Sequence, residues 1–308
     1  MSNKITLVFM GTPDFATGIF EGLLKSNFDI LAIFTQPDKA VGRKKILTPP
    51  HIKQFCIKNN INIPIYQPAK LRDSENVEIL KKLNPSFIVV SAYAQILSLD
   101  ILKIAPCINL HASLLPQYRG ASPIQQSLLN DNNQTGVTAM LMDEGLDTGD
   151  ILGYVVFDIP KHMFVDDLFD KLCTLATKLA INTLNNFNKV SHKKQISALS
   201  SHTKKINKQQ GLIEFDNAKY IHLKHKAFKG WPDIFLANGL KLISVEINST
   251  KNTNDEKGSI VEICKTYVVV ACDIGSLKIY VIQPPSKQKM SIVDYIKGKR
   301  IGIGDLLL

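Results

Sequence analysis

The fold can be predicted outward from one stretch, Ile101-Leu-Lys-Ile-Ala-Pro-Cys-Ile-Asn-Leu-His111. Its apolar residues predict a buried strand over Ile101–Leu110. Because successive side chains of a strand point to opposite faces, Asn109 and His111 should project to the same side. A carboxylate follows downstream in Asp147-Thr-Gly-Asp150. An amide, an imidazole and a carboxylate are the groups needed to transfer an acyl group to an amine, so we expect an enzyme.

Strand-like and helix-like segments alternate through the first half of the chain. The expected strands cover residues 5–10, 30–34, 63–66 and 87–92, followed by 137–142 and 151–159. The expected helices end at Leu24, Lys58, Leu83 and Asn185, and residues 38–50 are expected to form a long polar loop. This alternation predicts an α/β domain with a Rossmann-like, doubly wound parallel sheet.

Ligands of such sheets bind beyond the carboxyl ends of the strands, and Asn109 and His111 lie at such an end. The turn after the first strand reads Gly11-Thr-Pro13, which predicts Thr12 as a helix cap with Pro13 at the first helical position. A dinucleotide fingerprint would need glycine where Pro13 and Ala16 stand. A nicotinamide or ATP site is therefore disfavoured.

The second half of the chain has a different character. Residues 188–210 are polar and rich in Lys, Ser and His, which is typical of a linker. Beyond it, a helix at 220–229 precedes short strands at 241–248, 259–262, 267–272 and 277–282, a spacing typical of a small oligonucleotide-binding (OB) type barrel. We therefore expect a catalytic domain over 1–189, a linker over 190–210 and an OB-like domain over 211–308.

Composition restricts the class of protein. With 308 residues, 45% of them hydrophobic, the chain is long enough for two cores. No apolar run is long enough for a membrane helix, so no membrane partner is expected. The five cysteines include no C-x-x-C pair. We expect free thiols in a reducing cytoplasm, no zinc or other metal, and no obligate protein partner.

Positive charge is concentrated at the C-terminal end. Residues 190–308 carry 19 Lys and Arg against 10 Asp and Glu, whereas residues 1–189 carry 18 against 17. Drift in composition explains the preference for Lys over Arg, but it should affect both parts alike. The asymmetry therefore predicts a polyanionic partner for the C-terminal third.

The polar groups around the key strand fit an acyl-transfer site. The Asn109 amide can donate a hydrogen bond to an oxyanion, and His111 can donate to it or accept a proton from the nucleophile. Asp147 is expected to hold the imidazole in one tautomer. A lone histidine at a strand end is more often a satisfied polar residue, and Asp-Thr-Gly-Asp is a common turn. The three residues together favour catalysis.

The same residues resemble a known signature. Asn109-x-His111-x-Ser113-Leu-Leu-Pro116 followed by Asp147-Thr-Gly-Asp150 is similar to the motif of the folate-dependent formyltransferase family. Phe9-Met-Gly-Thr-Pro-Asp14 and Trp231-Pro232 extend the likeness to the branch that acts on methionyl-tRNA. The resemblance implies 10-formyltetrahydrofolate as formyl donor, initiator Met-tRNA as acceptor, and a catalytic group of Asn109, His111 and Asp147. It further implies that the folate lies against Ser113, Leu114, Leu115 and Pro116.

Two groups of basic residues are expected to contact the tRNA. The first lies on the 38–50 loop, which by resemblance would reach the acceptor stem, and comprises Lys39, Arg43, Lys44 and Lys45. The second lies in the last part of the expected linker and comprises Lys204, Lys205 and Lys208. Most charged loops are merely solvated. We expect Trp231 to be a core anchor and Cys107 to be a small packing residue rather than a nucleophile.

Three functions remain open at this point. The first is formyl transfer to Met-tRNA for translation initiation. The second keeps the same catalytic residues but uses a small amine, such as a nucleotide sugar or glycinamide ribonucleotide, which gives no reason for a strongly basic C-terminal third. The third is a nucleic-acid-binding protein with a degenerate Rossmann domain. It would require loss of Asn109, His111 or Asp147, and all three are present.

Overall fold

A computed structural model describes residues 4–42, 44–251 and 254–307. The chain forms two compact units. The first comprises the described residues up to Pro123, together with Gln134–Asp158 and Leu168–Lys204. The second comprises Ile124–Asn133, Ile159–Asp167 and the described residues from Lys205 onward.

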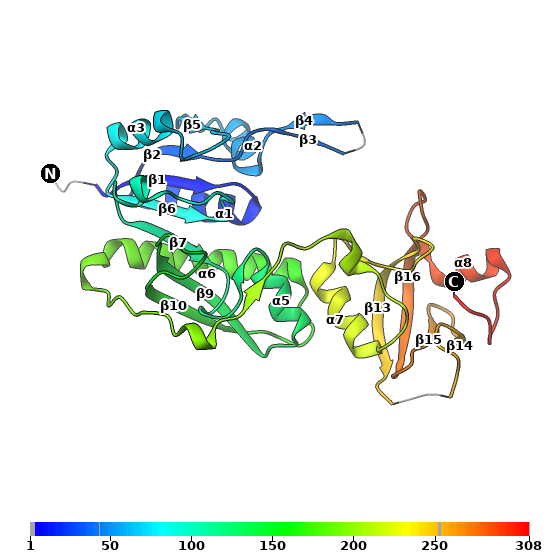
Figure 1. The fold of residues 1–308 in the computed structure, drawn as a ribbon. Coiled ribbons are helices and arrows are strands. Elements are labelled where there is room, and N and C mark those ends of the chain that lie inside the picture. Colours follow the sequence, from blue (N-terminus) through cyan, green and yellow to red (C-terminus); the bar gives the residue numbers. More distant parts are fainter. Residues whose placement is uncertain (1–3, 43, 252–253, 308) are drawn as a thin grey trace. The chain divides into compact units, whose positions relative to one another are not determined.

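The first unit is built on a seven-stranded sheet with the order β10-β9-β7-β6-β1-β2-β5 (Figure 1). Its strands are β1 (Thr6–Gly11), β2 (Asp29–Phe34), β5 (Ile65–Tyr66), β6 (Phe87–Ser91), β7 (Cys107–His111), β9 (Gln134–Leu141) and β10 (Ile151–Asp158). The five strands from β7 to β5 are parallel, as expected. Strands β9 and β10 continue the sheet in antiparallel orientation, so the sheet is mixed.

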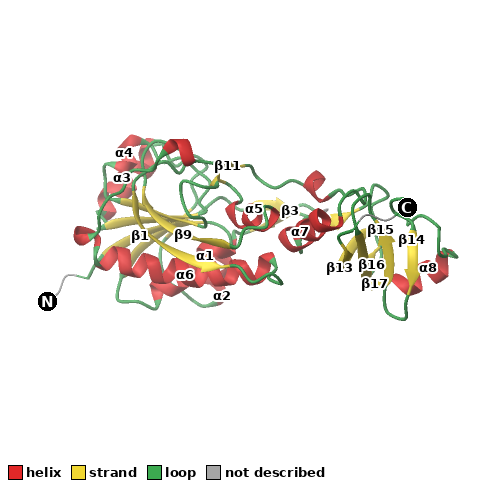
Figure 2. Cartoon of the chain, turned by 90° about the horizontal axis from the view of Figure 1, so that it is seen from below, coloured by secondary structure: helices red, strands yellow, loops and turns green. Residues whose placement is uncertain are grey.

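Helices cover both faces of this sheet (Figure 2). They are α1 (Asp14–Leu24), α2 (His51–Lys58), α3 (Ser74–Leu83), α4 (Leu99–Leu102) and α6 (Val165–Asn185). Figure 2 shows α3 and α4 on one face and α1, α2 and α6 on the other. Gly18 and Gly22 allow α6 to approach α1, because an added Cβ would lie 2.4 Å from Cys173 Sγ and 2.2 Å from Thr177 Cγ2.

Three local expectations for this unit are wrong. Residues 101–106 are not strand: α4 ends at Leu102, and β7 begins only after Pro106, which lacks the N–H that a central strand donates. Pro13, not Thr12, occupies the N-cap of α1, and the Thr12 hydroxyl donates instead to the Tyr93 carbonyl at 3.4 Å. The loop at 38–50 contains a hairpin, β3 (Lys39–Val41) and β4 (Ile46–Thr48).

The segment expected to be a linker also differs from a free chain. Residues 190–204, hereafter the strap, belong to the first unit. The strap pairs with Ile151 through Lys193, and its strand β11 (His202–Thr203) pairs with β8 (Arg119–Gly120). Short 3-10 helices lie at Phe187–Lys189, Ser197–Leu199 and Lys208–Gly211. The polar composition therefore reflects hydrogen bonding to the rest of the first unit as well as exposure to solvent.

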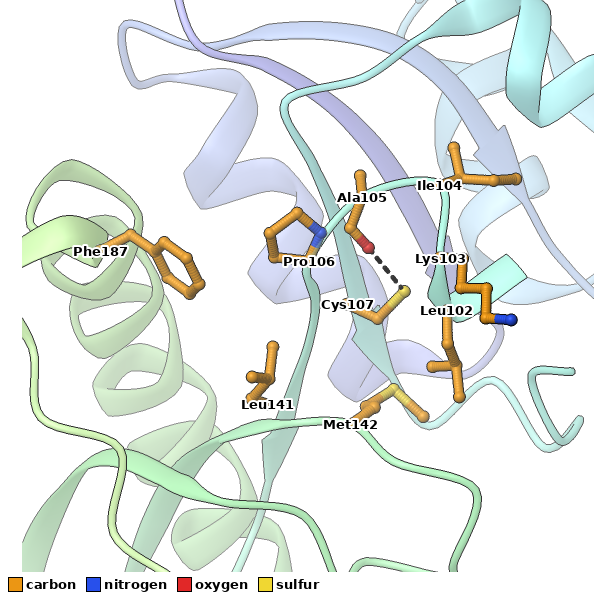
Figure 3. A pocket seen from close by; sticks show the side chains of 9 residues that line it. All are labelled: Leu102, Lys103, Ile104, Ala105, Pro106, Cys107, Leu141, Met142 and Phe187. Carbon is orange, nitrogen blue, oxygen red and sulfur yellow. Dashed lines mark hydrogen bonds between the residues drawn. The ribbon is translucent and has the colours of Figure 1, made fainter. Parts of the chain in front are cut away.

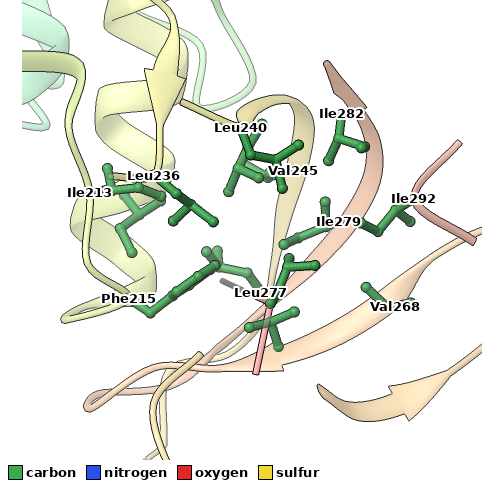
Figure 4. Packing of buried hydrophobic residues seen from close by; sticks show 14 of the residues in the cluster. Ile213, Phe215, Leu236, Leu240, Val245, Val268, Leu277, Ile279, Ile282 and Ile292 are labelled. Carbon is green, nitrogen blue, oxygen red and sulfur yellow. The ribbon is translucent and has the colours of Figure 1, made fainter. Parts of the chain in front are cut away.

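The second unit contains a six-stranded antiparallel sheet around one apolar core (Figure 4). Its strands are β12 (Ile234–Phe235), β13 (Lys241–Ser249), β14 (Ile260–Ile263), β15 (Val268–Ala271), β16 (Ser276–Gln283) and β17 (Met290–Ser291). Its helices are α7 (Ala218–Phe228) and α8 (Ile292–Lys299), and α5 (Pro123–Leu129) begins at the boundary between the units. The expected class, a Rossmann-like domain followed by a small β-domain, is confirmed.

Trp231 is not the core anchor that we expected, because its side chain is 57% exposed. It stands at the tip of a turn whose neighbours Phe228 and Pro232 are both buried. The Asp233 backbone N–H donates to the Phe228 carbonyl at 2.9 Å, and the Gly230 N–H donates to Asp233 Oδ1 at 2.8 Å. The turn is thus held from both ends, and the indole between them faces solvent.

Candidate catalytic site

Strand β7 supplies the first two polar side chains of the site. It lies between β6, which is parallel, and β9, which is antiparallel, and all five of its residues are buried. Asn109 is 9% exposed and His111 is 6% exposed. Both interact with the same carboxylate, Asp147, so they project to one side of the strand as predicted.

Asp147 closes the site from the loop after β9, and its side chain is 11% exposed. Its Oδ1 accepts a hydrogen bond from Asn109 Nδ2 at 3.1 Å, and its Oδ2 accepts one from the Gly120 backbone N–H at 2.8 Å. His111 Nδ1 lies 3.6 Å from Oδ2. The three residues selected from the sequence therefore form one cluster, in which the carboxylate is held by two donors.

The tautomer of His111 is set by a group that sequence reasoning did not identify. His111 Nε2 lies 2.9 Å from the Tyr118 carbonyl oxygen. Because a carbonyl can only accept, Nε2 carries the proton. In the neutral ring the lone pair is then on Nδ1, which faces Asp147. The expectation that Asp147 fixes the tautomer is corrected: the Tyr118 carbonyl does so.

Gly120 allows the loop between Arg119 and Ala121 to reach Asp147. Its φ is +109°, a region that favours glycine, and an added Cβ would lie 2.3 Å from the Thr203 carbonyl oxygen. The strap thus presses on this residue from one side while its N–H binds Asp147 on the other. A side chain at position 120 would displace either the strap or the carboxylate.

Two further residues stabilise the Asp147 loop and were missed in the sequence. Gln195, on the strap, donates from Nε2 to the carbonyl oxygens of Asp147 at 3.0 Å and Gly149 at 2.8 Å. Arg119 is 4% exposed and donates to Gln195 Oε1 from Nε at 3.1 Å and from Nη2 at 2.8 Å. Arg119 carried a signal, since it is one of four arginines in a lysine-rich chain. Gln195, within a polar stretch, carried none.

In the segment predicted to contact folate, Ser113–Pro116, several polar groups are already hydrogen-bonded to other parts of the protein. Ser113 is fully buried, and its hydroxyl donates to the Gln117 carbonyl at 2.6 Å. Thr138 links the segment to β9, donating to the Ser113 carbonyl at 2.7 Å and accepting from the Leu115 N–H at 3.1 Å. Leu115 is buried, whereas Leu114 and Pro116 are partly exposed. Only the latter two offer apolar surface, and folate contact here stays a prediction.

A cavity of about 390 Å³ lies elsewhere on the first unit (Figure 3). Cys107, Leu141, Met142 and Phe187 contribute to its lining. Cys107 begins β7 and His111 ends it, so this cavity lies about 13 Å along the strand from the imidazole. The Cys107 thiol donates to the Ala105 carbonyl at 3.3 Å, and burial raises its pKa to about 12. Cys107 is therefore a packing residue, as predicted, and the cavity is separate from the Asp147 cluster.

The predicted tRNA-contacting lysines are all exposed. Lys39 lies on β3, while Lys44 and Lys45 lie in its turn to β4. Lys204 ends the strap, and Lys205 and Lys208 follow it. Lys208 Nζ lies 5.8 Å from the centroid of the Phe235 ring. Arg43 lies outside the described residues. The structure thus presents these cations to solvent, and their contact with tRNA stays a prediction.

Within the ranges that the structure describes, no group of three or more His, Cys, Asp or Glu side chains is arranged to hold a metal ion. Among the same residues, no helix has both the length and the apolar composition to span a bilayer.

Comparison with known proteins places this geometry in a family. The formyl transferase model matches residues 3–184, and the model of the formyl transferase C-terminal domain matches residues 205–300. A methionyl-tRNA formyltransferase from Nitratiruptor sp. is 54% identical, covering 97% of this chain and 98% of that protein. The corresponding enzyme from Campylobacter jejuni is 46% identical, covering 98% and 99%.

Solved structures show the same fold at lower identity. An N-formyltransferase from Helicobacter canadensis, solved with folinic acid and dTDP-3-aminofucose, aligns with a TM-score of 0.65 at 20% identity, covering 90% of this chain and 99% of that one. HypX from Aquifex aeolicus, solved with tetrahydrofolic acid, aligns with a TM-score of 0.65 at 12% identity, covering 98% of this chain and 48% of that one. Both family models and the relatives aligned over nearly the whole chain agree, so the chain belongs to the formyltransferase family.

Proposed function

We propose that this chain transfers the formyl group of 10-formyltetrahydrofolate to the α-amino group of methionyl initiator tRNA. The observation that carries the proposal is the Asn109–Asp147–His111 cluster, in which an amide donor and an imidazole nitrogen converge on one held carboxylate. The relatives that are about half identical over nearly the whole chain bear the name of this activity. The proposed compartment is the cytoplasm, where the product serves translation initiation.

The chemistry requires one bond to form and one to break. The amine nitrogen attacks the formyl carbon, and the carbonyl oxygen becomes an oxyanion. Asn109 Nδ2 has a second N–H beyond the one donated to Asp147, and this N–H is the proposed oxyanion donor. The C–N bond to the folate then breaks, leaving a formylated amine and tetrahydrofolate.

His111 is the proposed proton carrier for this step. Its Nε2–H is committed to the Tyr118 carbonyl, which leaves Nδ1 to accept the proton that the attacking amine loses. That proton can return to the leaving nitrogen of the folate. Asp147 would stabilise the imidazolium that forms between the two transfers, because its Oδ2 lies 3.6 Å from Nδ1.

Recognition of the tRNA is assigned to the exposed lysines and to residues 211–308. Phosphate contacts supply affinity without reading sequence. Replacing Lys204, Lys205 and Lys208 together by Gln should weaken binding of all tRNAs and reduce the salt slope by about 0.7–0.9 per lost contact. The matched control replaces three exposed lysines of the first unit, Lys58, Lys70 and Lys82. Equal salt slopes for the two triple variants would remove the strap end from the tRNA surface.

The experiment that tests the function offers a labelled formyl donor to the enzyme with alternative acceptors. We expect label to appear on the amino group of Met-tRNA, and on initiator tRNA in preference to elongator tRNA. A nucleotide sugar with a free amine and glycinamide ribonucleotide are the competing acceptors. Transfer to either small amine, without transfer to Met-tRNA, would replace the proposed acceptor while leaving the formyltransferase chemistry in place.

A further inference from the structure

Gln195 uses its whole side-chain amide to connect the strap to the Asp147 loop. Its two N–H groups are directed to the Asp147 and Gly149 carbonyls, at 3.0 and 2.8 Å. Its oxygen accepts two hydrogen bonds from Arg119, at 3.1 and 2.8 Å. A single side chain thus bonds two residues of the loop that carries the carboxylate and one residue of the loop that binds it.

The loop needs such support because its backbone is in an unfavourable conformation. Asp147 has φ +55°, in the left-handed region that few non-glycine residues adopt and that the surrounding structure has to support. Its side chain is held by Asn109 and Gly120, and its carbonyl by Gln195. The Gln195 bond therefore opposes rotation of the peptide unit that follows the Asp147 side chain.

Arg119 fixes the orientation of Gln195. A guanidinium can only donate, so the Gln195 atom facing it must be the oxygen, and the nitrogen must face the two carbonyls. Arg119 is itself buried, and its own backbone carbonyl accepts from the Thr203 hydroxyl at 3.2 Å. The donors of Arg119 therefore determine which end of the Gln195 amide faces the two carbonyls.

We infer that Gln195, oriented by Arg119, is a positioning residue for formyl transfer: it holds Asp147 where that carboxylate can bind Asn109 and face His111. The inference rests on the proposed function, because it acts through the proposed catalytic carboxylate. It extends the catalytic site to the strap, a segment whose composition is that of a linker. Gln195 does not touch the reacting atoms in this account.

Gln195→Glu is the sharpest test because it preserves the shape of the side chain while it replaces the two N–H donors by an acceptor oxygen and adds a negative charge. The carboxylate still accepts from Arg119, but its other oxygen would face two carbonyls that need a donor. We expect kcat to fall about 10- to 100-fold, since a small misplacement of a catalytic group has effects of this size. The KM values for the formyl donor and Met-tRNA should stay within about two-fold, because no substrate contact is removed.

Two further variants separate positioning from folding. Gln195→Met removes the donors without burying a charge, and should lower kcat in the same way. Gln134→Glu is the matched control: Gln134 is an exposed glutamine of the same unit, which donates to Asp158 at 2.7 Å. Full activity is expected for the control. A kcat loss in Gln195→Met explained by a smaller folded fraction in thermal unfolding would overturn the inference.

A double-mutant cycle distinguishes failure of the inference from failure of the proposed site. If Gln195 acts only through Asp147, adding Gln195→Met to Asp147→Asn should slow the reaction little further. Multiplicative losses, or a kcat of Gln195→Met within about two-fold of wild type, would overturn the positioning role. Normal turnover of Asp147→Asn alone would instead overturn the proposed catalytic group.

Discussion

Each of the two units buries a histidine, and the two histidines are equally buried but have different surroundings. His111 in the first unit and His225 in the second are both 6% exposed. His111 is surrounded by acceptors, with the Tyr118 carbonyl at one nitrogen and the Asp147 carboxylate facing the other. His225 instead packs edge-on against the Phe164 ring, with a centroid distance of 5.2 Å.

Their surroundings assign them opposite roles. Burial, and then the neighbouring His222, lower the pKa of His225 to about 4, so this ring is neutral near pH 7. His111 faces a carboxylate that can stabilise its charged form during turnover. Burial by itself therefore does not indicate catalysis. The groups that lie against each ring are what distinguish the two histidines.

The largest effect is expected on turnover, when the two histidines are replaced in separate variants. His111→Ala should lower kcat by about a hundred- to thousand-fold, because it removes the proposed proton carrier. His225→Leu should leave kcat within about two-fold, since no step of the proposed chemistry uses this ring. Steady-state kinetics at saturating substrates gives both values. Comparable losses in the two variants would break the distinction between the two histidines.

A second effect concerns stability and pH. The folded-state pKa of His225 lies below the ordinary value near 6.5, so the unfolded chain takes up the proton first as the pH falls. The free energy of unfolding is therefore unaffected by His225 above about pH 6.5. It falls as the pH drops from there towards 4, by up to about 3 kcal/mol.

Urea unfolding at about pH 7 and about pH 5 measures this loss. Trp231 reports on the second unit alone, because it is the only tryptophan of the chain. His225→Leu should reduce the pH dependence relative to wild type. An unaltered pH dependence in the variant would contradict the assigned environment of His225.

The smallest expected effect concerns two aromatic residues of the second unit. Trp231→Ala should change the free energy of unfolding by less than about 0.5 kcal/mol, as surface substitutions generally do. Phe228→Ala, three residues earlier and 1% exposed, should lower it by about 3–5 kcal/mol. Thermal or urea unfolding compares the pair. A large loss for Trp231→Ala would return the indole to the anchoring role that we first expected.

Much of the fold could be predicted from residue periodicity. The spacing of apolar residues predicts the ends of α2, α3 and α6 as the structure has them, because these amphipathic helices each have one buried face. It fails over residues 101–106, where a short buried helix and a loop are as apolar as a strand. It also fails at Trp231. The apolar residues around this turn do not alternate regularly, so the sequence does not show that Phe228 and Pro232 are buried while Trp231 is exposed.

Only those parts of the candidate site that are side chains of distinctive chemistry could be predicted from the sequence. Asn109, His111 and Asp147 could be selected because their polar groups stand out at a strand end and in a turn. The Tyr118 carbonyl and the Gly120 N–H could not, because every residue has such groups. Gln195 lies 48 residues from Asp147 in the sequence, and only the return of the strap to β8 brings the two together.

The proposed function depends most on stabilisation of the oxyanion by Asn109, which Asp147 holds, and one measurement tests this role directly. This is the single-turnover rate of formyl transfer to Met-tRNA by Asn109→Ala, with both substrates saturating. Loss of one oxyanion donor should slow this step by about a hundred- to thousand-fold while binding of both substrates is retained. A rate close to that of wild type would contradict the claim.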